Sequence, residues 1–233
     1  IGLILSNWGR RSGRNLTTIG LLAFGIFIVV SVGLNHRDAT KGSDQKESGT
    51  GGYELFVETT TPVVNNQNYS RIQDTPGGVE AEENLNIIPI RKKNGDDGSC
   101  LNPNMVQKPQ MLGLDPDQLS GHFTFVKKHK TVSNFHNWDV LDHNYGPGVI
   151  PAVADMSVIQ WGFGMGLGDT LHYLSESGEE LNLILVAGLA NSIFQGSVII
   201  SEENFKKYYP ANSGYKIFLV DTPDVQKTQQ DLY

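Results

Sequence analysis

The hydrophobic pattern divides the chain into one uninterrupted apolar run and a much longer polar part. From Leu16 to Leu34 there is no charged residue and almost no strongly polar one. A helix of roughly 19 residues, at about 1.5 Å rise per residue, nearly crosses the ~30 Å hydrocarbon layer of a bilayer. The pattern therefore predicts a transmembrane helix over these residues.

Two other structures share such a run, namely a cleaved signal peptide and a buried core helix. No small-x-small cleavage site follows the run cleanly, and the run lacks the polar face that is usual for a core helix. Three glycines inside it would let neighbouring helices approach closely: Gly20, Gly25 and Gly33. Ahead of the run, Ile1–Trp8 is apolar with a polar edge, which predicts a short amphipathic helix at the membrane surface.

Basic residues before the run set the predicted orientation. Three arginines precede it: Arg10, Arg11 and Arg14. Only His36, Arg37 and Asp38 follow it directly. Because cytoplasmic flanks of membrane helices carry the excess of Lys and Arg, we expect the N-terminus in the cytoplasm and the rest of the chain outside, in the periplasm or extracellular space.

Beyond the run, short segments of alternating or apolar residues predict strands between polar turns. The Gly- and Ser-rich stretch Ala39–Gly52 is expected to be a linker. Met111–Gln118 predicts a short helical turn, Phe135–His143 predicts a helix, and Pro89 favours an edge strand. The strands expected in this half are Tyr53–Thr60, Leu85–Arg91 and His122–Lys127.

The pattern sharpens after Gly148. We expect Asp155 to cap a helix over Met156–Phe163, and Ser201 to cap a second helix that has acids in its first turn and lysines near its end. The strands expected here are Val149–Val153, Thr170–Ser175, Glu180–Leu189, Ser197–Ile200 and Tyr215–Asp221. A polar, helical tail is expected over Asp224–Tyr233. This mixture predicts an α+β domain.

Composition narrows the class of protein. The 233 residues carry a formal net charge of −7, which argues against a nucleic-acid partner, since phosphate binding needs clustered Lys and Arg. The one cysteine, Cys100, excludes an intramolecular disulfide and is expected to be a buried, inert thiol. Because the first residue is Ile1, we expect the chain to be a fragment of a longer protein.

Several motifs suggest chemistry, but each has a simpler structural interpretation. The four glycines of a G-x-G-x-G-x-G run resemble a phosphate loop, yet they follow an expected helix and precede a strand, the reverse of a dinucleotide-binding fold: Gly162, Gly164, Gly166 and Gly168. We interpret them as a helix end followed by a turn. Asp96 and Asp97 lack the ligand spacing of a calcium loop and are expected to cap turns.

Histidines and nucleophiles give no catalytic pattern. Four histidines recur every seven residues, but the segments between them do not form one helix: His122, His129, His136 and His143. No HExxH metal motif and no G-x-S-x-G nucleophile elbow is present in the sequence. We therefore expect no catalytic residue, no cofactor and no metal ligand in this chain.

Two stretches resemble a known family. They are RRSGRNLTTIGLLAFGIFIVVSVG near the N-terminus and, later, VIPAVADMSVIQWGFGMGLGDTLHY with LILVAGLANSIFQGSVIISEENFKKYYP and GYKIFLVD. The chain resembles ABC transporter permeases of the FtsX-like type, the group that includes MacB-like and lipoprotein-releasing permeases. The resemblance covers nearly the whole chain. It is strong over Arg10–Leu34 and Val149–Asp221 and weaker over Gly51–Pro147.

The resemblance implies a permease subunit without catalytic residues of its own. Such subunits dimerise, as homo- or heterodimers, and bind a separate cytoplasmic ABC ATPase, whose work moves the outside domain through the membrane helix. A bacterial inner-membrane location, contact with membrane lipid, and a periplasmic or outer-membrane partner are also implied. The chain departs from the family's pattern in carrying one membrane helix and no ATPase motif.

These expectations divide the chain into five parts. They are a basic cytoplasmic-side segment (1–14), a transmembrane helix (15–35), a linker (36–52), a periplasmic MacB-like core domain (53–222) and an exit segment leading toward a further membrane helix (223–233). The alternative function is a single-pass, membrane-anchored binding or sensor domain. Its ligand cleft would be lined by aromatic residues that are otherwise expected in the core: Trp138, Trp161, Tyr173 and Phe194.

Overall fold

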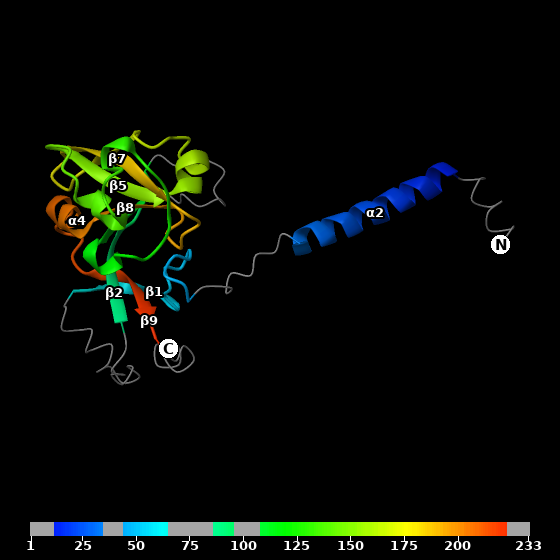
Figure 1. Ribbon diagram of the computed structural model, residues 1–233, viewed down its shortest axis with the longest axis horizontal. Helices are drawn as coiled ribbons and strands as arrows, with labels where there is room; N and C mark the ends of the chain where they lie inside the picture. The colour runs from blue at the N-terminus through cyan, green and yellow to red at the C-terminus, as the bar shows by residue number, and fades with distance from the viewer. Residues whose placement is uncertain (1–11, 35–43, 65–85, 96–107, 223–233) are drawn as a thin grey trace. The chain divides into compact units, whose positions relative to one another are not determined.

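The computed structural model describes residues 12–34, 44–64, 86–95 and 108–222 (Figure 1). These residues fall into two units, each described here by itself. The first unit holds helix α2 (Ser12–Leu34), and the second holds all the described strands and the remaining helices. The α+β class expected from the sequence is confirmed.

The described strands of the second unit form a mixed nine-stranded sheet. Its order is β1-β9-β2-β3-β8-β5-β7-β4, and β6 pairs with β7. The pairs β3–β8 and β5–β7 are parallel, whereas the others are antiparallel. The bounds are β1 (Leu55–Val63), β2 (Asn86–Lys93), β3 (Gln110–Leu114), β4 (Phe125–Lys128), β5 (Val149–Asp155), β6 (Thr170–Leu174), β7 (Glu180–Leu189), β8 (Ser197–Ser201) and β9 (Tyr215–Asp221).

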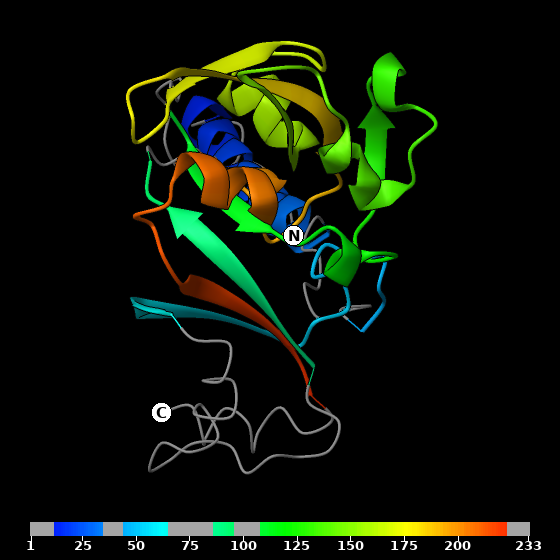
Figure 2. The same ribbon diagram turned by 90° about the vertical axis from the view of Figure 1, so that its left-hand side faces the viewer.

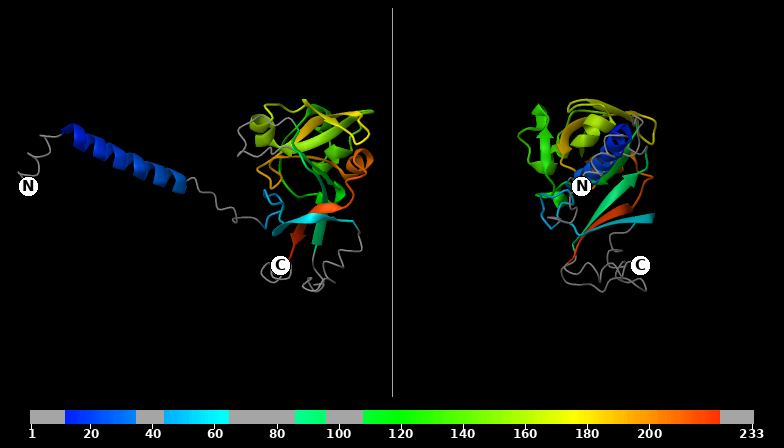
Figure 3. Two further views of the ribbon diagram at one scale, coloured as in Figure 1. Left: turned by 180° about the vertical axis from the view of Figure 1, so that it is seen from behind. Right: turned by 90° about the vertical axis from the view of Figure 1, so that its right-hand side faces the viewer.

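Strand β2 joins two parts of this sheet. Its first half, Asn86–Ile90, pairs with β9, and its second half, Arg91–Lys93, pairs with β3. The ribbon of β1, β9 and β2 thus connects to the larger part through one shared strand, and it lies apart from that larger part in Figures 2 and 3. At Pro89 the strand has β9 as its paired neighbour on one side, which is the edge-like environment that a residue without an N–H requires.

The short helical turn expected within Met111–Gln118 lies at the end of that range, whereas residues Met111–Leu114 belong to strand β3. Strand β3 runs parallel to β8 and its last four residues are buried. A short apolar run does not by itself distinguish a strand buried on both faces from a buried helix. The chain turns in a 3₁₀ helix, η2 (Asp117–Leu119), only after β3 ends.

The helix expected around Trp138 is a 3₁₀ helix, η4 (Asn137–Asp142), preceded by a shorter one, η3 (Lys130–Val132). The indole of Trp138 is fully buried, and its Nε1 donates to the His122 carbonyl oxygen at 3.0 Å. The polar atom of this large core side chain is therefore satisfied, and the local geometry follows from packing the ring rather than from helix propensity.

The helix expected after Asp155 is present and ends as a π-helix, η5 (Val158–Gly162). The buried Asp155 carboxylate caps it as predicted, because Oδ1 accepts from the Ser157 amide at 3.0 Å and from its hydroxyl at 2.6 Å. Its other oxygen accepts from the Ser192 amide at 2.7 Å. One carboxylate thus ties this helix to the loop that follows β7.

Helix α4 (Glu202–Tyr208) confirms the second predicted cap. The Ser201 hydroxyl accepts from the Asn204 amide at 3.4 Å, with acids in the first turn and lysines in the last. The helix packs on β3 through the fully buried Phe205. A Cβ on Gly113 of β3 would lie 2.5 Å from the Phe205 side chain, so only glycine allows this close approach.

Residues 44–52 differ from the free linker that their composition favours. They form successive turns whose carbonyl groups accept hydrogen bonds from the domain, including one from the Phe123 amide to Lys46 O at 2.6 Å and one from the Ile193 amide to Gly49 O at 2.9 Å. Backbone pairing with distant residues has no local sequence signature, so composition does not reveal it.

A charged junction holds the β1-β9-β2 ribbon against α4. Glu202 Oε1 accepts from Arg91 Nε of β2 at 2.8 Å, from Tyr215 Oη of β9 at 2.7 Å and from Lys206 Nζ at 2.8 Å. The Arg91 guanidinium also lies 4.6 Å from the centroid of the Tyr215 ring. Burial alone would raise the pKa of Glu202, but the hydrogen bonds from Lys206, Arg91 and Tyr215 outweigh burial and lower that pKa.

We predict that Glu202→Gln lowers the free energy of unfolding by about 2 kcal/mol at pH 7, the range for hydrogen bonds to charged groups. A lowered native pKa stabilises the fold above the unfolded value of 4.5, and this contribution fades as the pH falls through the native pKa. Urea unfolding at pH 7 and pH 3 should therefore show a difference between variant and parent that shrinks at the lower pH.

The matched control is Glu203→Gln on the next position of α4, whose side chain is exposed and has no place in this junction. Its effect should stay within about 0.5 kcal/mol of zero. Equal losses in both variants, or a Glu202→Gln loss that persists unchanged at pH 3, would contradict the assignment.

Candidate functional site

Helix α2 is the first candidate functional element, because its apolar side chains are exposed. Leu16–Gly33 is long and apolar enough to cross a membrane, and none of it is buried within the structure. Burying apolar surface is favourable by roughly 25 cal/mol per Å², so the exposed apolar side chains make this helix a candidate membrane span by length and composition. The side chains at least 61% exposed are Leu16, Leu21, Leu22, Phe24, Ile26, Phe27, Val29 and Val32.

The three helix glycines do not share one face of α2. At about 100° per residue, Gly25 and Gly33 lie about 80° apart, whereas Gly20 lies about 140° from each of them. A Cβ added at any of the three would meet nothing within 4 Å. Close approach of a neighbouring helix therefore has one candidate face, at Gly25 and Gly33, and Gly20 points away from it.

The residues predicted to set the membrane orientation are only partly within the described chain. Arg14 lies in the first turn of α2 and Leu34 is the last residue of that helix. Arg10 and Arg11 lie outside the described residues, as do Ile1–Trp8 and Asp224–Tyr233. The cytoplasmic N-terminus accordingly stays a prediction from charge.

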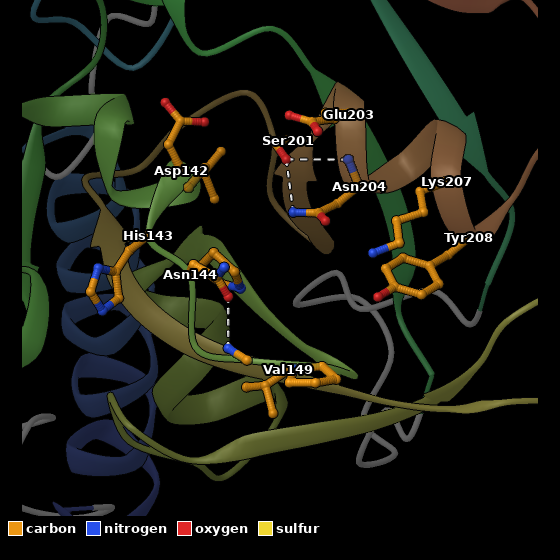
Figure 4. Close-up of a pocket in the computed structure, with 13 residues that line it drawn as sticks. Asp142, His143, Asn144, Val149, Ser201, Glu203, Asn204, Lys207 and Tyr208 are labelled. Carbon is orange, nitrogen blue, oxygen red and sulfur yellow. Dashed lines mark hydrogen bonds between the residues drawn. The ribbon is translucent and has the colours of Figure 1, made fainter.

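The second candidate is a polar cleft of about 540 Å³ on the domain (Figure 4). Helix α4 borders it on one side, and the end of η4 with the loop into β5 borders it on the other. Its lining residues are Leu141, Asp142, His143, Asn144, Gly146, Pro147, Val149, Pro151, Ser201, Glu203, Asn204, Lys207 and Tyr208.

Hydrogen bonds within the cleft fix its two walls. Asn144 Oδ1 accepts from the Gly146 amide at 2.8 Å, which shapes the loop. On the α4 side, Asn204 Nδ2 donates to Ser201 Oγ at 2.9 Å (Figure 4). The Lys207 ammonium lies 4.9 Å from the centroid of the Tyr208 ring, which places a cation at the rim.

Carboxylates dominate the charge beside this cleft. A second hollow of about 340 Å³ shares Asp142, Ser201 and Glu203 with it and adds further acids from the β3–η2 turn. Burial raises the pKa of Asp142, and four neighbouring carboxylates raise it further: Asp117, Asp139, Glu203 and Asp115. The cleft is therefore a polar surface of net negative charge that suits cationic groups better than anions.

The structure brings no catalytic constellation together in this cleft. Among the residues that the structure describes, no three His, Cys, Asp or Glu side chains gather as metal ligands would. The four evenly spaced histidines lie in different environments: His122 contacts Gly51 O, His129 contacts Thr131, His136 precedes η4, and His143 stacks edge-on with Phe135 and Tyr145. Asp96, Asp97 and Cys100 lie outside the described residues.

The aromatic residues proposed to line a cleft divide into core and surface. Three of them are core residues, as the simpler interpretation held: Trp138, Tyr173 and Phe194. Trp161 is instead 82% exposed on the π-helix η5. The cleft of about 540 Å³ is lined by other, mostly polar residues, which no sequence pattern marked. Tyr173 lines a separate hollow of about 220 Å³ together with Met111 and Leu174.

The glycine run forms the end of a helix and the turn after it, as the sequence predicted. It begins at Gly162, the last residue of η5, and precedes β6, with positive φ at Gly164 (65°) and Gly168 (98°). The Gly166 amide donates to Asp169 Oδ2 at 2.8 Å, so an acid of the same turn occupies the donor that a phosphate would need. This arrangement is a turn rather than a phosphate-binding loop.

Comparisons with known proteins give structural likenesses but no match to a family model or a curated protein. A similar solved structure is the crystal structure of the extracellular domain of the noncanonic ABC-type transporter YknZ from Gram-positive bacteria, with 10% sequence identity and a TM-score of 0.34. The alignment covers 76% of this chain and 88% of that chain.

We predict that Asp142→Asn stabilises the protein slightly at pH 7, because it removes a charge that the neighbouring acids disfavour. A carboxyl whose native pKa is raised costs stability as the pH rises above its unfolded value of 3.8. The side chain is largely solvated, so the gain should be only about 0.5 kcal/mol. It should vanish near pH 3, measured by urea unfolding against Glu179→Gln in the distant β6–β7 turn. A loss of stability at pH 7 would refute the repulsive role.

Proposed function

We propose that this chain is part of an ABC transporter permease subunit, comprising a membrane helix and the extracytoplasmic domain that the helix moves. The observation that carries the proposal is the unburied apolar segment Leu16–Gly33, which is followed in the chain by a folded α+β domain. A helix of this length and composition can span a bilayer.

The order of elements in the domain supports the same proposal. The resemblance implies a small apolar strand, a helix, a turn at G-D-T-L into a strand pair, and an apolar strand followed by a helix with an acidic start. The structure contains these elements in that order, from β5 through η5, β6, β7 and β8 to α4. The segment Gly168–Leu171 forms the turn and the start of β6.

Both chain ends of the domain lie at one place, which suits a domain inserted between membrane segments. Strands β1 and β9 are antiparallel neighbours, with Leu55 paired to Val220. The Thr222 amide donates to Glu54 Oε2 at 3.2 Å, which links the two ends directly. Movement of a membrane segment on either side would thus act on the same strand pair, and through β2 on the larger part of the sheet.

In this proposal ATP hydrolysis belongs to a partner. The chain contributes no nucleotide site; it contributes α2, whose sliding or tilting in the bilayer would shift the extracytoplasmic domain. The subunit pairs with a second permease subunit through helix contacts, and the domain faces the periplasm or the cell exterior. Its open, polar cleft is then a surface for a transported molecule or a periplasmic partner.

The direct test is affinity purification of the intact protein from native membranes. We expect an ABC ATPase with a Walker A motif to co-purify and the complex to turn over ATP. Protein recovered in folded, membrane-inserted form without such a partner, from a gene with no ATPase gene beside it, would reject the permease assignment.

A membrane-anchored binding or sensor domain is the second candidate, and the cleft of about 540 Å³ is the observation that favours it. Ligand sites of this kind are commonly about 300–1,000 Å³. A thermal-shift screen of the intact protein with small cationic and zwitterionic compounds would test it. Binding with no ATPase partner would favour the sensor, and the reverse result would favour the permease.

The permease proposal predicts that Gly25→Leu and Gly33→Leu each reduce ATP turnover of the assembled transporter by roughly tenfold, because a large side chain prevents close helix approach. Membrane insertion should be unchanged, since both substitutions add apolar surface. Gly20→Leu, which adds the same side chain on the opposite face of α2, is the matched control and should leave ATP turnover unchanged. Normal turnover in both glycine variants would make α2 a plain anchor.

A further inference from the structure

The segment 44–52, called the clip here, lies folded against the domain immediately before the first strand. Its own turns are closed by hydrogen bonds from Ser48 N to Gln45 O at 2.9 Å and from Gly51 N to Ser48 O at 3.0 Å. Four of its carbonyl groups accept hydrogen bonds from the domain: Lys46 O from Phe123 N, Glu47 O from Thr124 Oγ1, Gly49 O from Ile193 N, and Gly51 O from the His122 ring at 2.6 Å.

Two glycines let the clip approach the domain closely. A Cβ on Gly49 would collide with the backbone carbonyl oxygen of Asn191. A Cβ on Gly51, which has a φ of 68°, would lie 2.5 Å from the Phe123 ring. The first collision is with backbone atoms, which cannot rotate away, so Gly49 is the stricter requirement.

One of the residues that receive the clip is conformationally strained. Within the described chain, three non-glycine residues have positive φ: Phe123 (66°), Asn137 (34°) and Asn191 (43°). Phe123 and Asn191 both contact the clip. Asparagine adopts such values readily, but they are rare for an aromatic residue, in which they persist only where surrounding structure holds them. The strained residue Phe123 therefore lies where clip and domain meet.

The clip is attached mainly by polar contacts. Its first four residues, 44–47, are exposed and carry no apolar side chain. The first buried apolar side chain is Tyr53, just past its end, which stacks on the His122 ring with centroids 4.9 Å apart. The clip thus contributes no apolar side chain of its own to the core, and Gly51 packs against the buried Phe123 ring. Segments held mainly by polar contacts open locally without unfolding the core.

We propose that the clip docks reversibly on the domain and thereby sets the length of the tether between α2 and the domain. Ten residue steps separate Leu34 from Asp44, and nineteen separate Leu34 from Tyr53. At about 3.5 Å per residue, the maximum reach is roughly 35 Å with the clip docked and roughly 65 Å with it released. Release thus nearly doubles the distance the domain can move from the end of the helix.

Reversible docking of the clip involves only residues of this chain. The proposal therefore applies to a permease and to an anchored sensor alike. In a permease, the docked clip gives a short tether that passes helix movement to β1, and the released clip gives slack that does not. The positive φ of Phe123 favours this switching, because release would allow that residue to adopt an ordinary backbone conformation.

Hydrogen exchange on the full-length protein in nanodiscs tests reversible docking. The amides of Phe123 and Ile193 donate to the clip, whereas the Leu185 amide donates to Asp169 O in the core. We expect the first two to exchange about 100-fold faster than Leu185, in a common local opening. Exchange of all three at one rate, through global unfolding, would overturn the proposal.

Gly49→Ala tests the same contact by substitution. It should abolish protection at Phe123 and Ile193 and leave Leu185 protected, while Gly166→Ala, whose Cβ makes only ordinary contact, changes neither. Spin labels at Val32→Cys and Leu174→Cys, in a Cys100→Ser background, should then report a longer and broader distance distribution. An unchanged distribution despite lost protection would overturn the tether-length role. If Gly49→Ala unfolds the core, the exchange rates of the unsubstituted protein decide the question alone.

Discussion

The apolar surface of α2 is the constraint from which the rest of the arrangement follows. Eighteen residues with no buried position form a helix that is long and apolar enough to cross a membrane, and removing their surface from water is favourable. Ten residue steps later the chain already belongs to a polar, folded domain. At most about 35 Å of extended chain therefore joins Leu34 to Asp44, and in the proposed permease a movement of the helix would reach the domain through this connection.

Within the domain, the β1-β9-β2 ribbon and the clip are held by contacts of different number and kind. The β1-β9-β2 ribbon is tied to the larger part by the shared strand β2 and by the Glu202 carboxylate, which receives three charged or hydroxyl donors. The clip, in contrast, is held by a few hydrogen bonds at the surface. A load applied at the chain ends would thus be resisted by the junction and relieved at the clip.

Sequence patterns predicted those parts whose geometry is decided locally. The apolar run of α2, the β6–β7 hairpin and the Ser201 cap each depend on neighbours a few residues away, and each is present. Strand β3 escaped detection because QMLGL owes its state to parallel pairing with β8, some 87 residues further on. The polar cleft escaped for the same reason, since η4, β5 and α4 meet there only in the folded chain.

The clip shows why composition misjudges such segments. Gly and Ser are typical of free linkers because they are small and permissive, yet the same properties allow a backbone to approach another backbone closely. Gly49 and Gly51 are needed here for contact rather than for freedom. The feature that distinguishes this docked segment from a free linker lies in the domain residues that it contacts, Phe123 and Asn191, which have positive φ. No pattern within residues 44–52 reports it, so a Gly-rich stretch beside a membrane helix has to be judged by what it contacts.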